Sequence, residues 1–163
     1  MKTRIAALLT ALTITFAALA TISFIPKASA QGSVPTALAS GSIPAATESN
    51  IYLLARIISA EARGEPYTGQ VAVGAVILNR IKHPSFPDTL SGVIYQGGAF
   101  TAIVDGQFNQ PISDSAYNAA RDALNGWDPT GGAIYYYNPS KTSNAFMHSR
   151  PTIVTIGAHR FCS

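Results

Sequence analysis

The sequence between residues 57 and 66 reads IISAEARGEP, and it places a carboxylate at the end of an apolar helical pattern. Leu54 and Ile58 recur at helical spacing, and Glu61 is the next residue on the same face. Gly64 suits the left-handed position that closes a helix. The pattern therefore predicts a helix that carries Glu61 in its last turn.

A glutamate in this position has an unusual chemistry. Apolar neighbours and the negative end of the helix dipole both disfavour ionisation, so we expect its pKa to be raised. A carboxyl group that stays protonated can act as a general acid. Arg56 and Arg63 would favour the carboxylate instead if they reached it. The residues alone leave two interpretations open, a catalytic acid and a helix-end glutamate paired with an arginine.

The other acidic residues near the motif have structural explanations. Glu65 lies four residues beyond Glu61, where the following proline disfavours helical geometry. We interpret Glu65 as structural, bound to loop amides or to an arginine, with a second catalytic carboxylate as the alternative. Further acids are explained as caps or turn residues: Asp105, Asp114 and Asp128.

Aromatic and amide side chains along the chain are suited to binding a sugar. Aromatic rings can stack on pyranose faces, and amides can bond hydroxyl and acetamido groups. The candidate substrate-binding residues are Gln70, Phe100, Gln107, Tyr135, Tyr136, Tyr137 and Asn138. Alternation along an extended strand places one or two of the tyrosines in the core, whatever the function.

Metal and thiol chemistry have little support. The three histidines, His83, His148 and His159, show no metal-binding spacing, so we expect no metal and no cofactor. Cys162 is the one cysteine, which excludes an internal disulfide. Its position near the C-terminus favours a small buried side chain over a nucleophile.

The N-terminal residues read as a targeting segment. A basic start precedes an apolar run from Ile5 to Ile25 and the small-residue motif Ala28-Ser29-Ala30. This predicts a signal peptide over residues 1–30, cleaved near Ala30, and an exported product. The alternative is an uncleaved anchor, because the run is long enough to span a membrane.

Removing that segment changes the charge. The chain has 11 basic and 8 acidic residues, and three of the basic ones, Lys2, Arg4 and Lys27, precede the cut. The remainder has eight of each and no formal net charge. The basic pI therefore gives no evidence for a nucleic-acid partner.

The remaining chain is long enough for one compact domain. Residues 31–47 are uncharged and rich in small residues and proline, which predicts a linker, and the folded domain should span 48–163. Ser49 or Asn50 is the expected cap of its first helix.

The later elements combine helices with short strands. Residues 69–82 predict a buried helix, with a buried strand as the alternative, and a helix capped by Ser113 or Asp114 should end at Gly126. Short strands are expected at 102–104 and 152–156. The fold class is α+β, mainly helical with a small β-rich insert.

Several long motifs together resemble one known family. They are EARGEPYTGQVAVGAVILNR (61–80), HPSFP (83–87), the glycine-rich stretch 92–107, and AARDALNGWDPTGGA (119–133), which continues into YYNP, SRP and the C-terminal IGAHRFC. With these motifs the chain resembles the spore cortex-lytic and cell wall hydrolase family, with its SleB-type catalytic domain. The resemblance spans about residues 50–162.

The resemblance implies a lysozyme-like fold and a lytic transglycosylase that cleaves peptidoglycan glycan strands, leaving 1,6-anhydro-N-acetylmuramic acid ends. It implies that the first glutamate of the motif, Glu61, is the catalytic acid. We interpret Arg63 and Glu65 as supporting residues. Peptidoglycan is then the binding partner, and no stable protein partner is inferred. Germination enzymes of this type usually carry an N-terminal peptidoglycan-binding domain, whereas only residues 31–47 precede the domain here, so a stand-alone exported wall hydrolase fits equally well.

Two other functions remain open from the sequence. One is a muramidase that uses water as the nucleophile. The other is a non-catalytic peptidoglycan-binding module, which would use the tyrosines and amides without needing Glu61.

Overall fold

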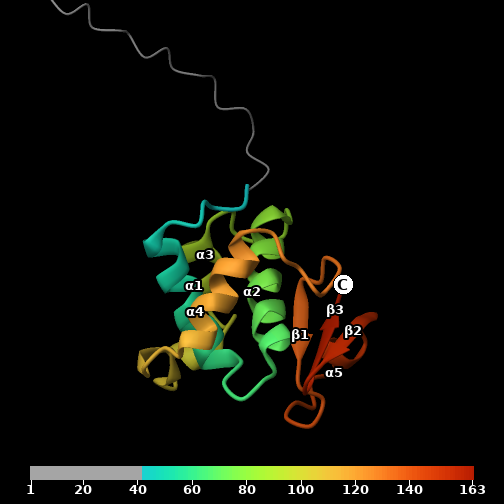
Figure 1. Ribbon diagram of the computed structural model, residues 1–163. Coiled ribbons are helices and arrows are strands. Elements are labelled where there is room, and N and C mark those ends of the chain that lie inside the picture. The colour runs from blue at the N-terminus through green and yellow to red at the C-terminus, as the bar shows by residue number, and fades with distance from the viewer. Residues whose placement is uncertain (1–41) are drawn as a thin grey trace, which may run out of the picture. The chain divides into compact units, whose positions relative to one another are not determined.

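The computed structural model describes residues 42–163 (Figure 1). The predicted signal peptide and most of the predicted linker lie outside the described residues. Within 42–163, no helix combines the length and the apolar character needed to cross a membrane.

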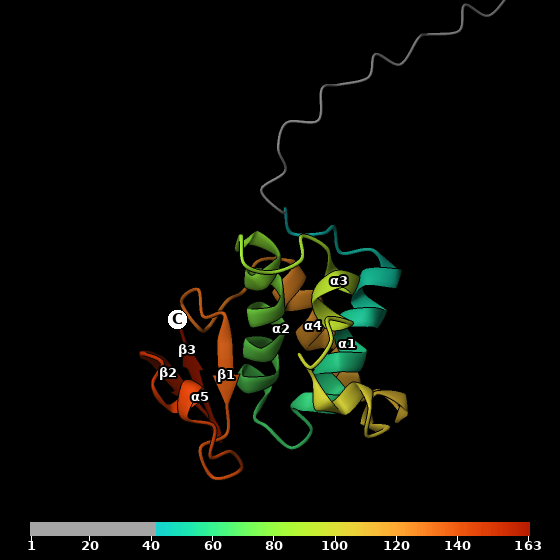
Figure 2. The same ribbon diagram turned by 180° about the vertical axis from the view of Figure 1, so that it is seen from behind.

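Three long helices share the hydrophobic core: α1 (Glu48–Glu61), α2 (Tyr67–Lys82) and α4 (Asp114–Leu124). They approach closely at Gly74 of α2. A Cβ atom there would lie 2.9 Å from Ile58 Cδ1 of α1 and 3.1 Å from Ala123 Cβ of α4. In both ribbon views α2 stands between the other two helices and the sheet (Figures 1 and 2).

Short-range contacts set the helix ends. Thr47 caps α1 by accepting a hydrogen bond from the Asn50 N–H. The predicted caps Ser49 and Asn50 are therefore wrong, because both residues already lie inside the first turn. Ser113 caps α4 as predicted, and Gly126 follows that helix with a φ of 102°.

The apolar run of the second helix is confirmed as helical. Every residue from Val71 to Leu78 is buried within α2. A helix that is apolar on all sides is stable only in the centre of a domain, and α2 lies there, in contact with α1, α3, α4 and the sheet.

The strand expected at 102–104 is wrong. The turn-rich segment holds α3 (Leu90–Ile94) and two 3₁₀ helices, η1 (Thr101–Ile103) and η2 (Gln107–Asn109). Ala102 is buried and Val104 is 85% exposed, and no described strand lies beside them to form a ladder. Without a partner strand, the β-branched residues Ile103 and Val104 do not form a strand, and Thr101–Ile103 forms a 3₁₀ turn.

The β-structure lies near the C-terminus and forms one antiparallel sheet. Its strands are β1 (Tyr135–Tyr137), β2 (Thr152–Ile156) and β3 (His159–Cys162), in the order β1-β3-β2. The strand predicted at 152–156 is confirmed. A short helix, α5 (Ala145–His148), lies in the connection between β1 and β2. The fold is thus mainly helical with a small three-stranded sheet.

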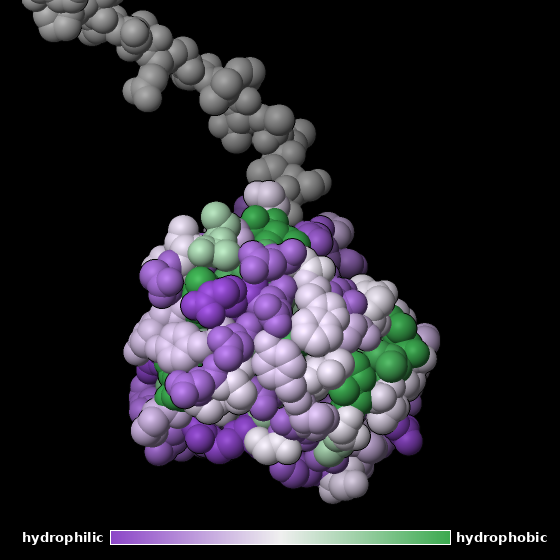
Figure 3. Space-filling view, viewed as in Figure 1, coloured by the Kyte–Doolittle hydropathy of each residue, from purple (hydrophilic) through white to green (hydrophobic). Residues whose placement is uncertain are grey.

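Buried side chains of the sheet attach it to the helices. Phe161 of β3 is fully buried, and Cys162 is buried and free, as predicted. The exposed apolar residues are scattered, and the face in Figure 3 shows apolar patches separated by hydrophilic or neutral residues. The sheet therefore belongs to the same folded unit as the helices.

Candidate active site

Glu61 is the last residue of α1, as the sequence predicts. The N–H of Ala62 closes the helix on the Ile58 carbonyl, and Gly64 turns the chain with a φ of 90°. The turn sends the backbone toward α2 and leaves the Glu61 side chain at the helix end. This local geometry follows directly from the EARG sequence.

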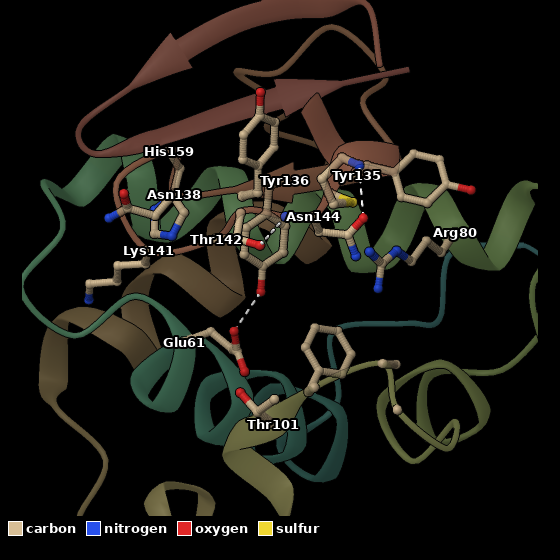
Figure 4. Close-up of a pocket in the computed structure, with 15 residues that line it drawn as sticks. Glu61, Arg80, Thr101, Tyr135, Tyr136, Asn138, Lys141, Thr142, Asn144 and His159 are labelled. Atoms are coloured by element: carbon tan, nitrogen blue, oxygen red, sulfur yellow. Dashed lines mark hydrogen bonds between the residues drawn. The ribbon is translucent and has the colours of Figure 1, made fainter. Parts of the chain in front are cut away.

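A tyrosine from the sheet holds the Glu61 carboxyl group. The Tyr136 hydroxyl on β1 donates to Glu61 Oε2 at 3.0 Å (Figure 4). Glu61 Oε1 is buried and has no hydrogen-bond partner among residues 42–163. The carboxyl is thus fixed through one oxygen, and the missing hydrogen-bond partner at the other oxygen favours the neutral acid over the anion.

The surroundings raise the pKa of Glu61 above its ordinary value. Burial is the largest cause, and the hydrogen bond from Tyr136 offsets part of it. The Ala102 N–H also favours the anion, although it lacks full hydrogen-bond geometry. Smaller charge effects come from Asp105, which raises the pKa, and Arg80, which lowers it. The Tyr136 phenol itself has a raised pKa because it is buried, so it keeps its proton and remains a donor.

The two arginines close to Glu61 in sequence do not pair with it. Arg56 donates to the Phe108 carbonyl and to Asn109, and Arg63 donates to Ser59 and to the Pro111 carbonyl. Within the described residues, the one carboxylate within ion-pair distance of a basic side chain is that of Glu65, beside His159. The interpretation of Glu61 as a partner of Arg56 or Arg63 is therefore wrong.

A cavity of about 410 Å³ lies beside Glu61, between the helical layer and the sheet. Of the predicted sugar contacts, the aromatic ones and Asn138 line it: Phe100, Tyr135, Tyr136, Tyr137 and Asn138. The sequence reasoning did not identify several other lining residues: Arg80, Gly98, Ala99, Thr101, Lys141, Thr142, Asn144, Met147 and His159. Aromatic rings, amides and hydroxyls in one concave site suit a sugar ligand.

Two predicted contacts are not brought to this cavity. The Gln70 amide donates to the Glu65 carbonyl and accepts from Ser115 of α4, so it ties α2 to its neighbours. Gln107 bonds Asp105 through both its backbone and its side chain. Both amides are used in local structure, which residue type alone could not show.

Glu65 joins the α1–α2 turn to the hairpin between β2 and β3. Its Oε2 accepts from the Ala158 N–H at 2.9 Å, and its Oε1 lies 3.4 Å from His159 Nδ1. Burial lowers the pKa of His159, which favours a neutral ring at the cavity wall, while the Glu65 carboxylate acts against this. Glu65 therefore makes structural contacts, and it is not among the cavity-lining residues.

The site has a single carboxyl group. Glu61 is the one acidic residue among those that line the cavity. Asp128 bonds Thr130, Gly132 and Asn79, which holds its pKa below the usual range despite partial burial. Among residues 42–163, no cluster of three metal-binding side chains occurs. The geometry offers one general acid and a polar, aromatic cleft.

Comparison with known proteins gives concordant matches. A family model described as Cell Wall Hydrolase matches residues 64–162. The spore cortex-lytic enzyme of Bacillus cereus is 51% identical over 116 residues, which cover 71% of this chain and 45% of the relative. The chain thus spans less than half the length of that curated relative.

Two solved structures are also similar. The catalytic domain of the germination-specific lytic transglycosylase SleB from Bacillus anthracis matches with a TM-score of 0.68 and 50% identity, covering 72% of this chain and 96% of that one. The catalytic domain of Bacillus cereus SleB matches with a TM-score of 0.67 and 50% identity, covering 72% and 91%. The family match begins at Gly64, so the position and environment of Glu61 come from the geometry given above.

Proposed function

Because this chain belongs to the cell wall hydrolase family, we propose that it is a lytic transglycosylase that cleaves peptidoglycan glycan strands, with Glu61 as the catalytic acid. The observation that carries the proposal is the partly buried Glu61 carboxyl at the cavity wall, with its raised pKa and its hydrogen bond from Tyr136. The spore cortex-lytic relatives and the SleB structures support the same activity. The same comparisons favour spore cortex as the substrate.

The first chemical step uses the protonated acid. Glu61 donates its proton to the glycosidic oxygen between N-acetylmuramic acid and N-acetylglucosamine, and the bond to the anomeric carbon breaks. An oxocarbenium-like state develops on the muramic sugar. Glu61 becomes a carboxylate in this step, and the Tyr136 hydroxyl stabilises the new charge on Oε2.

The second step needs no further enzyme carboxylate. The Glu61 carboxylate takes the proton from the muramic 6-hydroxyl, whose oxygen attacks the anomeric carbon of the same sugar. An intramolecular nucleophile has a large proximity advantage, which explains how one acid can serve both steps. An inverting muramidase would need a second carboxylate facing the sugar, and Glu61 is the one acid that lines this cavity.

The organisation of the whole chain is part of the proposal. We propose that residues 1–30 direct export, that 31–47 form a linker, and that 48–163 form the catalytic domain. We further infer that the domain is lysozyme-like, because a glutamate at the end of a buried helix faces a cleft beside a small antiparallel sheet.

Replacing Glu61 by Gln tests the function. The mature protein should clear a suspension of insoluble wall, and Glu61→Gln should bind the wall in a pull-down without clearing it. Full clearing by Glu61→Gln would refute the assignment. Wall binding by the wild-type protein with no clearing of either cortex or vegetative wall would favour a non-catalytic binding module.

A further inference from the structure

Arg80 of α2 is a buried cation in the cavity that the mechanism does not use. Its side chain is only 8% exposed, and it lines the same cavity as Glu61. Among residues 42–163 it forms no ion pair with a carboxylate. Burying a charge without a counter-ion is costly, so this arrangement calls for a physical explanation.

The protein holds the Arg80 guanidinium in a fixed orientation. Its Nε donates to the Ile134 carbonyl at 2.8 Å. Three aromatic rings surround it, with centroids 5.2 Å away for Phe86, 5.4 Å for Phe100 and 5.9 Å for Tyr135. The surrounding rings and the single carbonyl contact orient the planar group without neutralising it.

The remaining donors of Arg80 are directed to the cavity. Neither Nη group has a hydrogen-bond partner among residues 42–163, and Figure 4 shows the guanidinium at the cavity wall. A planar guanidinium with free N–H groups matches the two oxygens of a carboxylate. Burial lowers the pKa of Arg80, but a guanidinium remains charged at neutral pH.

The charge of the whole cavity favours an acidic ligand. Its ionisable lining includes two strong cations, Arg80 and Lys141, and one acid, Glu61, whose raised pKa favours the neutral form. In Figure 4 the two cations lie on opposite sides of the Glu61–Tyr136 pair. A strand bound across Glu61 would therefore meet a cation on each side of the bond to be cleaved.

We propose that Arg80 binds a carboxylate carried by the glycan strand and makes that charge a determinant of substrate choice. This inference rests on the proposed function, because it takes the bound strand to be peptidoglycan. Two sources offer the same chemistry, the lactyl carboxylate of peptide-free muramic acid and a carboxylate of the stem peptide.

Paired substrates that differ only in charge test the proposal. Soluble peptide-free strands are compared with the same strands after their lactyl carboxylates are converted to neutral amides. Peptide-bearing strands are treated in the same way as a second pair. The rates of fragment release give kcat and KM for the wild-type protein, Arg80→Met and Arg80→Lys. Lys82→Met is the control, because it removes an exposed cation from the same helix.

The expected result is a preference for charged strands that depends on Arg80. Amidation should raise the wild-type KM about tenfold or more, as for the loss of one charge-assisted hydrogen bond. Arg80→Met should show one KM for both members of a pair, and Arg80→Lys should keep part of the preference because it keeps the charge. Lys82→Met should behave like the wild type.

Each other outcome has a definite meaning. An effect on the peptide-free pair assigns the lactyl group, and an effect on the peptide-bearing pair alone assigns the stem peptide. Equal KM values for the wild type on both members of both pairs would overturn the proposal, even if Arg80→Met does not fold. A preference that survives in Arg80→Met would do the same. No fragments from any strand with the wild type would instead refute the proposed function, and the role of Arg80 with it.

Discussion

The hydrogen bond from Tyr136 to Glu61 gives the sharpest prediction of the mechanism. Tyr136→Phe removes one hydroxyl, which donates to Glu61 Oε2 at 3.0 Å. The ring itself keeps its packing against His159 and Phe161, whose ring centroids lie 5.4 and 5.9 Å away. The substitution therefore changes the environment of the acid while the fold is retained.

The size of the effect follows from the charge that Glu61 acquires. A hydrogen bond to an ionised group contributes about 1.5–3 kcal/mol. The carboxylate forms as the glycosidic bond breaks, so Tyr136→Phe removes most of this stabilisation from the transition state. We expect kcat to fall roughly ten- to a hundredfold, with little change in KM.

The pH dependence of activity provides an independent test of this hydrogen bond. Because the Tyr136 hydrogen bond lowers the pKa of Glu61, its removal raises that pKa further. The acid must be protonated for the first step, so activity falls as pH rises through the Glu61 pKa. The alkaline limb of Tyr136→Phe should therefore move to higher pH while kcat is reduced.

The assay is the rate of fragment release from soluble strands across a pH series. Tyr95→Phe is the matched control, because Tyr95 is 54% exposed and does not line the cavity. An unchanged kcat together with an unchanged alkaline limb in Tyr136→Phe would refute the assigned geometry of the acid.

Further predictions concern stability and are read from thermal or urea unfolding. Glu65→Ala should lower the free energy of unfolding by about 1–2 kcal/mol, because the Ala158 N–H loses its acceptor; an unchanged midpoint would show that this link carries no stability. Gly74→Ala should cost about 1–3 kcal/mol through overpacking against Ala123, and a stabilised variant would contradict the close helix contact. Glu61→Gln should be more stable than the wild type at neutral pH by about 1 kcal/mol. Because the pKa of Glu61 is raised in the folded state, its contribution to wild-type stability is full below about pH 4.5 and is lost as pH rises through the pKa of the folded state. The stability advantage of Glu61→Gln should therefore vanish in acid. A difference in unfolding free energy that does not change with pH would argue against a buried acid.

Local sequence patterns were sufficient for the three long helices and for the place of the acid. The spacing of Leu54, Ile58 and Glu61, with Gly64 beyond, predicted where α1 ends. The continuous apolar run of α2 predicted a central helix. Short β-branched segments were less informative, because residues 102–104 have strand-forming types but no partner strand.

The composition of the cavity depended on tertiary contacts that no local pattern encodes. In the sequence Arg80 lies near the polar end of the buried helix predicted over 69–82, and the fold places its guanidinium among aromatic rings in the cavity that Glu61 also lines. His159 lies at the site because β3 pairs with β1, whose tyrosines line the same cavity. A cation at the end of an otherwise apolar helix was the one available signal for Arg80.

The identity of the attacking oxygen tests the central claim most directly. Peptidoglycan is digested by the wild-type protein in ¹⁸O-labelled water, and the new glycan ends are weighed by mass spectrometry. The proposed mechanism predicts 1,6-anhydro ends without ¹⁸O, because the nucleophile is the sugar's own 6-hydroxyl. Reducing ends that carry ¹⁸O would show that water attacks the anomeric carbon, and would contradict the one-acid mechanism built on Glu61.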